Sequence, residues 1–206
     1  MAKAYLIGGV PRCGKTTIAL KTVAEHPMFA TSTDSVRYTL RNLFSSKDNP
    51  ALFNADASFE KTSGLELCKT GRASEIITVQ NEESEVVWPS VRRIIEGYIE
   101  EDLDILVEGV ALLPHLISEL NCEYSAIFVG NTSPSHGEHM LRHARSGSYD
   151  WMSNRSDEAI LEFAKFTNLF SEHFATEAKR YNMQFFDWSD SEYDTHIQRC
   201  VREVLN

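Results

Sequence analysis

The sequence predicts an α/β fold in which a mainly parallel, five-stranded sheet lies between two layers of helices. Short apolar runs alternate along the chain with longer segments of helical periodicity, the pattern of strands joined by crossover helices. The first apolar run ends in Gly8 and Gly9, just before a helix start. With 206 residues and an apolar share of 42%, the chain can form a core without disulfides or a structural metal.

Five apolar runs are expected to be the strands, because each is short and is bounded by glycine, acidic or other polar residues. They lie at 4–7, 29–33, 105–107, 125–129 and 184–186. The carboxyl ends of parallel strands share one edge of the sheet, and ligands of such folds bind beyond that edge. We therefore expect functional residues directly after these runs.

Helices are predicted where apolar residues recur every three to four positions. These segments are 15–25, 35–46, 84–102, 157–181 and about 193–204. Residues 47–80 give no firm pattern and are expected to form short helices over the sheet. Residues 132–156 are rich in histidine, arginine, serine and glycine, and are expected to form a mobile lid inserted into a single domain of residues 1–206.

Composition narrows the class of protein. The formal net charge of −10 argues against non-specific nucleic-acid binding, so no nucleic-acid partner is expected. No apolar run approaches the roughly 18 residues of a membrane span, and no secretory signal is visible. The four cysteines are scattered and are expected to be free thiols, so we expect a cytoplasmic protein. The oligomeric state stays open.

The segment after the first predicted strand has the pattern GxxxxGKT of a P-loop. Such a pattern also occurs by chance, but here it follows a predicted strand and opens a predicted helix, which is the context a P-loop requires. Its backbone N–H groups would surround phosphate oxygens, Lys15 would reach the β- and γ-phosphates, and the Thr16 hydroxyl would ligate Mg²⁺. The sequence therefore predicts ATP and Mg²⁺ as ligands. The nucleotide-binding residues expected are Gly9, Val10, Pro11, Arg12, Cys13, Gly14, Lys15, Thr16 and Thr17.

Two acids end the neighbouring strands. Asp34 follows the second strand and is expected to be a catalytic base or an acid that organises magnesium, although it would also suit the N-cap of the helix after it. Glu108 ends the third strand, in the position of an acid that holds Mg²⁺ directly or through water. The alternative for Glu108 is a polar residue that merely ends the strand.

Two pairs of arginines are candidates for binding anions. Arg37 and Arg41 are four residues apart on one predicted helix and could clamp a carboxylate or phosphate of an acceptor, or else form a solvated face. Arg142 and Arg145 lie in the expected lid, where they would neutralise charge on the transferring phosphoryl group. The histidines at 136, 139 and 143 lack the further ligands of a zinc site, and a solvated lid helix is the preferred interpretation.

Three segments together resemble the kinase domain of 2-phosphoglycerate kinases. They are GGVPRCGKTTIA at 8–19, STDSVRYTLR at 32–41 and VEGVALLP at 107–114. The resemblance implies a small-molecule kinase of the nucleoside-monophosphate-kinase-like class, with a lid and with ATP and magnesium as phosphoryl donor. One position departs from the family pattern, which carries a histidine where this sequence has Ala111.

The function expected is ATP-dependent transfer of the γ-phosphoryl group to a hydroxyl of a small anionic metabolite similar to 2-phosphoglycerate. Asp34 favours a hydroxyl acceptor, because an alcohol benefits from a base whereas a phosphate acceptor is already ionised. Two alternatives remain: a nucleotide-dependent switch, and a kinase that acts on a nucleotide conjugate or a macromolecule.

Overall fold

The computed structural model describes residues 2–61, 72–147, 151–189 and 192–206, and it contains a five-stranded parallel sheet. The strands are β1 (Ala4–Gly9), β2 (Phe29–Ser32), β3 (Ile105–Glu108), β4 (Tyr124–Gly130) and β5 (Gln184–Asp187). Their order across the sheet is β2-β3-β1-β4-β5, and every neighbouring pair is parallel. The predicted α/β/α fold class with five strands is confirmed.

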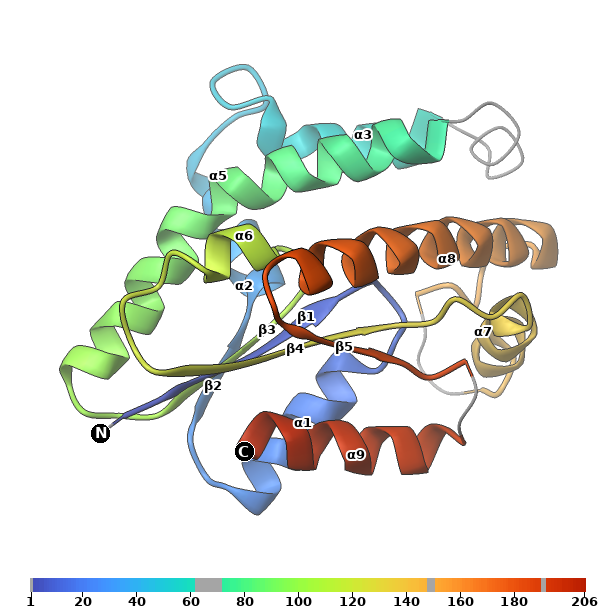
Figure 1. The fold of residues 1–206 in the computed structure, drawn as a ribbon. Helices are drawn as coiled ribbons and strands as arrows, with labels where there is room; N and C mark the ends of the chain where they lie inside the picture. The colour runs from blue at the N-terminus through green and yellow to red at the C-terminus, as the bar shows by residue number, and fades with distance from the viewer. Residues whose placement is uncertain (1, 62–71, 148–150, 190–191) are drawn as a thin grey trace.

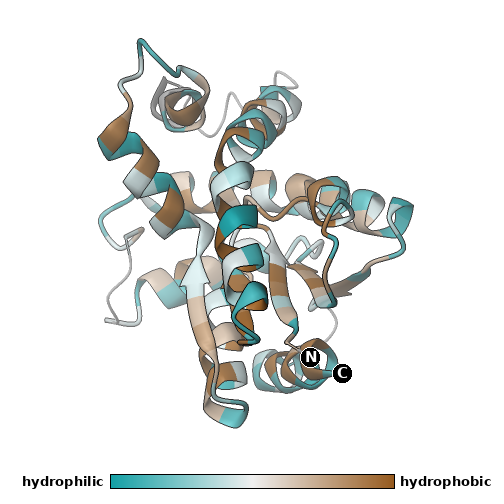
Figure 2. Cartoon of the chain, turned by 90° about the vertical axis from the view of Figure 1, so that its left-hand side faces the viewer, coloured by the Kyte–Doolittle hydropathy of each residue, from teal (hydrophilic) through white to brown (hydrophobic). Residues whose placement is uncertain are grey.

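Helices connect the strands and cover both faces of the sheet. The helices are α1 (Lys15–Glu25), α2 (Thr33–Leu43), α3 (Ala51–Lys61), α5 (Arg72–Glu100), α6 (Pro114–Ile117), α7 (His136–Ala144), α8 (Asp157–Arg180) and α9 (Tyr193–Leu205). Helices α1 and α9 pack on one face, while α5, α6 and α8 lie over the other (Figure 1). The side chains of the central strands β1, β3 and β4 form much of the core between these layers, and brown segments mark the hydrophobic residues in Figure 2.

The register of the strands decides which side chains meet at the carboxyl edge. Ile7 of β1 pairs with Glu108 of β3, and Ser32 of β2 also pairs with Glu108. The P-loop that follows β1 therefore lies beside the end of β3, and the start of α2 lies one strand further away. Gly109, just after β3, has φ +148°, and an added Cβ would lie 1.9 Å from the Thr33 Oγ1. This close approach brings the end of β3 against the start of α2.

Two helices begin earlier than predicted. Helix α2 begins at Thr33 rather than at residue 35, and the Ser32 hydroxyl caps it by accepting a hydrogen bond from the Ser35 N–H at 3.1 Å, so the alternative of Asp34 as the N-cap does not hold. Serine caps as well as aspartate does, and its earlier position places Asp34 inside the first turn. Helix α5 begins at Arg72, twelve residues before the predicted start, and α3 lies along its first half (Figure 1).

The expected lid contains a helix that packs against the rest of the molecule. Helix α7 lies on α8, and its Met140 and Ala144 form a small apolar cluster with Met152, Ile160 and Ala164. His136 is buried, so the prediction of a fully solvated lid helix was wrong at this residue. No helix in the described ranges has the length and apolarity needed to cross a bilayer.

Candidate functional site

The loop between β1 and α1 has the backbone of a phosphate-binding loop. Gly9 and Gly14 have positive φ angles of 121° and 84°, which favour glycine, and Arg12 also has a positive φ of 67°. A Cβ on Gly9 would lie 2.0 Å from the Val129 carbonyl oxygen, so only glycine fits beside β4. Gly14 precedes Lys15 as the N-cap of α1, and no side chain caps that end. The first N–H groups of α1 therefore remain directed at the loop, where an anion can accept from them.

Lys15 and Glu108, the last residue of β3, place opposite charges beside this loop. Lys15 is 9% exposed and its Nζ donates to the Val10 carbonyl oxygen at 2.6 Å. Burial lowers the pKa of Lys15, and the carboxylate of Glu108 opposes that effect. Burial also raises the pKa of Glu108, against the influence of Lys15 and of a hydrogen bond from Thr16. A polyphosphate would give the Lys15 ammonium a stronger acceptor than a backbone carbonyl.

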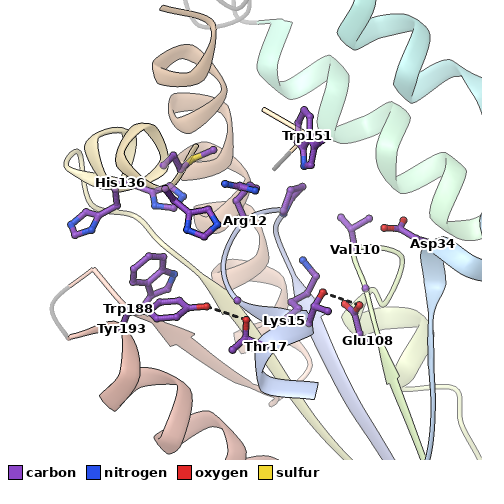
Figure 3. A pocket seen from close by; sticks show the side chains of 17 residues that line it. Arg12, Lys15, Thr17, Asp34, Glu108, Val110, His136, Trp151, Trp188 and Tyr193 are labelled. Carbon is purple, nitrogen blue, oxygen red and sulfur yellow. Dashed lines mark hydrogen bonds between the residues drawn. The ribbon is translucent and has the colours of Figure 1, made fainter. Parts of the chain in front are cut away.

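Two oxygen ligands suited to magnesium lie together beside Lys15. The Thr16 hydroxyl donates to the Glu108 Oε1 at 3.1 Å, so the two oxygens lie next to each other at the mouth of the loop (Figure 3). Mg²⁺ prefers oxygen ligands and retains several waters, which an open position of this kind permits. The residues present therefore fit the ion that the sequence predicts.

Cys13 lies in the same loop, and its environment does not favour a role as a nucleophile. Its side chain is fully buried, and burial raises the pKa of its thiol to about 12. The neutral thiol fills space under the loop.

Lys15, Thr16 and Glu108 line one cleft of about 540 Å³, and Asp34 joins them there. The Asp34 carboxylate comes from the first turn of α2, on the far side of Glu108 from the P-loop (Figure 3). It lies 3.3 Å from the Arg37 guanidinium, and its side chain is 52% exposed. An exposed carboxylate in the cleft can accept a hydrogen bond from an entering hydroxyl, which is the geometric requirement for a base.

The opposite wall of the cleft is aromatic, and the sequence analysis missed it. Trp188 follows β5, Tyr193 begins α9, and their rings lie 5.4 Å apart. The Tyr193 hydroxyl donates to the Thr17 Oγ1 at 3.2 Å, which ties this wall to the P-loop (Figure 3). His136 of α7 approaches Trp188 edge-on at 5.5 Å. Trp188 sits one residue beyond a strand end, so the rule used for Asp34 and Glu108 would also have found it.

One residue of this wall lacks hydrogen-bond partners among the described residues. Both ring nitrogens of His136 are buried, and neither makes a hydrogen bond there. Burial lowers the pKa of His136 to about 4, so its imidazole is neutral. The rings of this wall offer an apolar, aromatic surface against which a flat heterocycle could stack.

Arg37 and Arg41 do not line the cleft. Their side chains are 16% and 14% exposed, and both guanidiniums meet the buried carboxylate of Glu83 on α5. They are therefore not a solvated face. They lie directly behind Asp34, to which Arg37 is paired.

The two lid arginines also point away from the cleft in this structure. Arg142 is exposed on α7 and is absent from the cleft lining. Arg145 pairs with Asp157 and donates to the carbonyl oxygens of Ser153 and Arg155. These bonds tie the end of α7 to the start of α8. Trp151, by contrast, lies over the cleft above the P-loop and is 55% exposed (Figure 3).

The fold is the α/β fold of P-loop kinases, and its cleft brings together the phosphate loop, Glu108, Asp34 and a wall from α7. No protein-family model matches the chain. It is distantly homologous to 2-phosphoglycerate kinases. The protein of that name from Methanocaldococcus jannaschii is 24% identical over 177 residues, which cover 85% of this chain and 55% of the relative. The protein from Methanopyrus kandleri is 22% identical over 204 residues, which cover 98% of this chain and 59% of the relative.

The chain spans a little over half the length of these curated relatives. Among solved structures, a shikimate kinase from Bacteroides thetaiotaomicron aligns with a TM-score of 0.48 and 15% identity, covering 98% of this chain and 94% of that one. A gluconokinase from Sinorhizobium meliloti aligns with a TM-score of 0.47 and 12% identity, covering 99% and 91%. The homologues found by sequence are thus kinases of a small molecule.

Proposed function

We propose that this chain is an ATP-dependent kinase that transfers the γ-phosphoryl group to a hydroxyl of a small anionic metabolite similar to 2-phosphoglycerate. The observation that carries the proposal is that Lys15, Glu108 and Asp34 line one cleft. Charge for the phosphates, oxygen ligands for a metal and a base for an alcohol are therefore available together. The distant homology to 2-phosphoglycerate kinases supports the choice of acceptor.

In this proposal the nucleotide lies along the cleft from the aromatic wall to Lys15. The base rests against Trp188 and Tyr193, and the loop N–H groups and Lys15 hold the β- and γ-phosphates. Thr16 and Glu108 hold magnesium, which when bound screens the phosphate charge. The acceptor enters on the side of Asp34, Gly109 and Val110, which Trp151 overhangs.

Each of these side chains has one role in the proposed phosphoryl transfer. The acceptor hydroxyl gives its proton to the Asp34 carboxylate as its oxygen forms a bond to the γ-phosphorus. The bond between that phosphorus and the bridging oxygen of the β-phosphate breaks, and ADP leaves. Lys15 stabilises the negative charge that develops on the transferring group and on the leaving oxygen. Arg37 and Arg41, which do not line the cleft in this structure, are proposed to turn from Glu83 to the acceptor's anionic group, and Arg142 and Arg145 to contribute once the lid has rearranged.

A screen of small hydroxy acids and phosphorylated hydroxy acids for ATP consumption tests the proposal, with Lys15→Ala protein as the control. Acceptor-dependent ADP formation that Lys15→Ala abolishes is the expected result. Tight nucleotide binding without transfer to any small acceptor would instead favour a nucleotide-dependent switch or a larger substrate.

A further inference from the structure

Three helices on the acceptor side meet at one cluster of charges around the buried Glu83, defined here as Asp34, Arg37, Arg41, Asp56 and Glu83. The side chains of Asp34 and Asp56 are each 52% exposed. Arg37 and Arg41 come from α2, Asp56 from α3 and Glu83 from α5, and α3 lies along the first half of α5 (Figure 1). Glu83 is 1% exposed and occupies the centre: its Oε1 lies 3.5 Å from Arg37 and 3.2 Å from Arg41. Asp56 pairs with Arg41, and Asp34 pairs with Arg37 at the edge of the cleft.

The cluster holds more negative than positive charge. Two guanidiniums face three carboxylates, those of Glu83, Asp56 and Asp34, which leaves a formal charge of −1 when all are ionised. Its hydrogen bonding is also incomplete, because the Glu83 Oε2 and the Arg37 Nε are buried without a partner in the part of the chain that the structure describes. A buried carboxylate oxygen without a donor is costly, and a proton on Glu83 would relieve both the charge and part of that cost.

The surroundings of Glu83 decide how readily that proton is taken up. Burial raises the pKa of Glu83 to about 7; Arg37 and Arg41 act against this effect and Asp56 adds to it. The neighbouring titratable groups belong to other contacts. His173 of α8 faces Asn81, and burial lowers its pKa, while His115 of α6 faces the exposed Glu85.

We propose that the ionised Glu83 carboxylate competes with the acceptor's anionic group for Arg37 and Arg41. Protonation of Glu83 removes this competition, so Glu83 determines which acceptors bind and at what pH. When Glu83 is ionised, it holds both guanidiniums. When it takes a proton from solvent, the formal charge of the cluster rises from −1 to 0 and the hold of Glu83 on both guanidiniums weakens. Arg41 keeps its bonds to Asp56 and to the Leu52 carbonyl oxygen, so Arg37 is the first to turn to an anion entering beside Asp34. By linkage, binding of that anion in turn favours the protonated form of Glu83. This inference rests on the proposed function for the location of the acceptor.

The sign of the effect follows from the charge alone. Lowering the pH protonates Glu83 and strengthens anion binding, whereas raising the pH ionises it and weakens anion binding. Where one proton is taken up per anion bound, the affinity falls about tenfold for each pH unit. The dependence should therefore develop above about pH 7.

Sulfate is a suitable probe, because it remains a dianion throughout this range and needs no phosphoryl transfer. The protein is first saturated with magnesium and a non-hydrolysable ATP analogue, so that the P-loop is filled, and sulfate is then titrated calorimetrically from pH 6 to pH 8.5. Wild-type affinity should fall about tenfold per pH unit above pH 7, whereas Glu83→Gln should bind sulfate with little pH dependence. Glu85→Gln is the matched control, because Glu85 is two residues away on the same helix and 60% exposed, and it should retain the wild-type slope.

A second measurement needs no variant. Titrations at pH 7 in two buffers of different ionisation enthalpy give the protons taken up by the wild-type complex, and a substantial fraction of one proton per sulfate is expected. Absence of proton uptake, or a Glu83→Gln protein with the wild-type slope, would overturn the role of Glu83. Because neither readout requires turnover, failure of the proposed kinase activity would leave this result interpretable.

Discussion

Replacing Asp34 with asparagine should separate catalysis from folding. The amide keeps the size of the side chain but cannot take a proton from the acceptor hydroxyl. General-base help is typically worth about 10²- to 10⁴-fold in rate, so the barrier to transfer should rise by about 3–5 kcal/mol. Nucleotide affinity should stay close to wild type, because Lys15, Thr16 and Glu108 make the phosphate and metal contacts proposed above.

The contacts of Asp34 predict only a small loss of stability for Asp34→Asn. The pair between Asp34 and Arg37 is half exposed on the Asp34 side, and such pairs contribute about 0.5 kcal/mol. A carboxylate in the first turn of α2 gains about as much from the helix dipole, and the Ser32 cap is untouched. Asp34→Asn should therefore unfold about 2–4 °C below wild type.

The assay pairs turnover with calorimetric titration of the nucleotide. Glu158→Gln is a matched control, because Glu158 is an exposed acid in the first turn of α8 that does not line the cleft. It should show a similar small stability loss and normal turnover. Unchanged turnover in Asp34→Asn would refute the assignment of a base, and a large loss of magnesium–nucleotide affinity would show that Asp34 organises the metal instead.

Three further predictions concern other groups. Lys15→Ala should remain folded and lose about 10²-fold or more in rate, because a buried phosphate contact disappears; near-normal activity of the folded variant would contradict this. Nucleotide binding should require magnesium and prefer ATP over GTP only weakly, as calorimetry with both nucleotides can check; tight binding of GTP alone would argue against it. The free energy of unfolding should fall as the pH drops from about 6.5 to about 4, because burial lowers the pKa of His136 and His196 to about 4 and only the unfolded chain takes up their protons; Glu83, with its pKa raised to about 7, acts in the opposite direction, but with one proton against two. Urea denaturation across this range should give a smaller decline for His196→Gln, and an equal decline would show that His196 does not contribute.

Local patterns predicted the sheet and the phosphate loop because each is determined by neighbouring residues. Short apolar runs were sufficient to find all five strands. The order of glycine, lysine and threonine after the first strand predicted a loop whose Gly9 and Gly14 do adopt positive φ angles. The N-cap of α2 was missed because Ser32 and Asp34 both suit a cap, and spacing alone does not choose between them.

Contacts between distant segments could not be predicted in the same way. The proximity of Arg37 and Arg41 to Glu83 depends on how α5 packs against α2, some 42–46 residues along the chain. A signal was nevertheless present, because Glu83 interrupts an apolar stripe formed by Ile76, Val87 and Val91 on α5. An acid on the buried face of a helix indicates a cationic partner, although not which one.

The most direct test of the central claim is phosphorus NMR of the wild-type protein with ATP, magnesium and 2-phosphoglycerate. That acceptor has one free hydroxyl, so transfer should convert it into 2,3-bisphosphoglycerate with one ADP formed for each product molecule. The account predicts this stoichiometric conversion in the wild-type protein and none in Lys15→Ala. ATP hydrolysis to ADP and inorganic phosphate, with 2-phosphoglycerate unchanged, would contradict it.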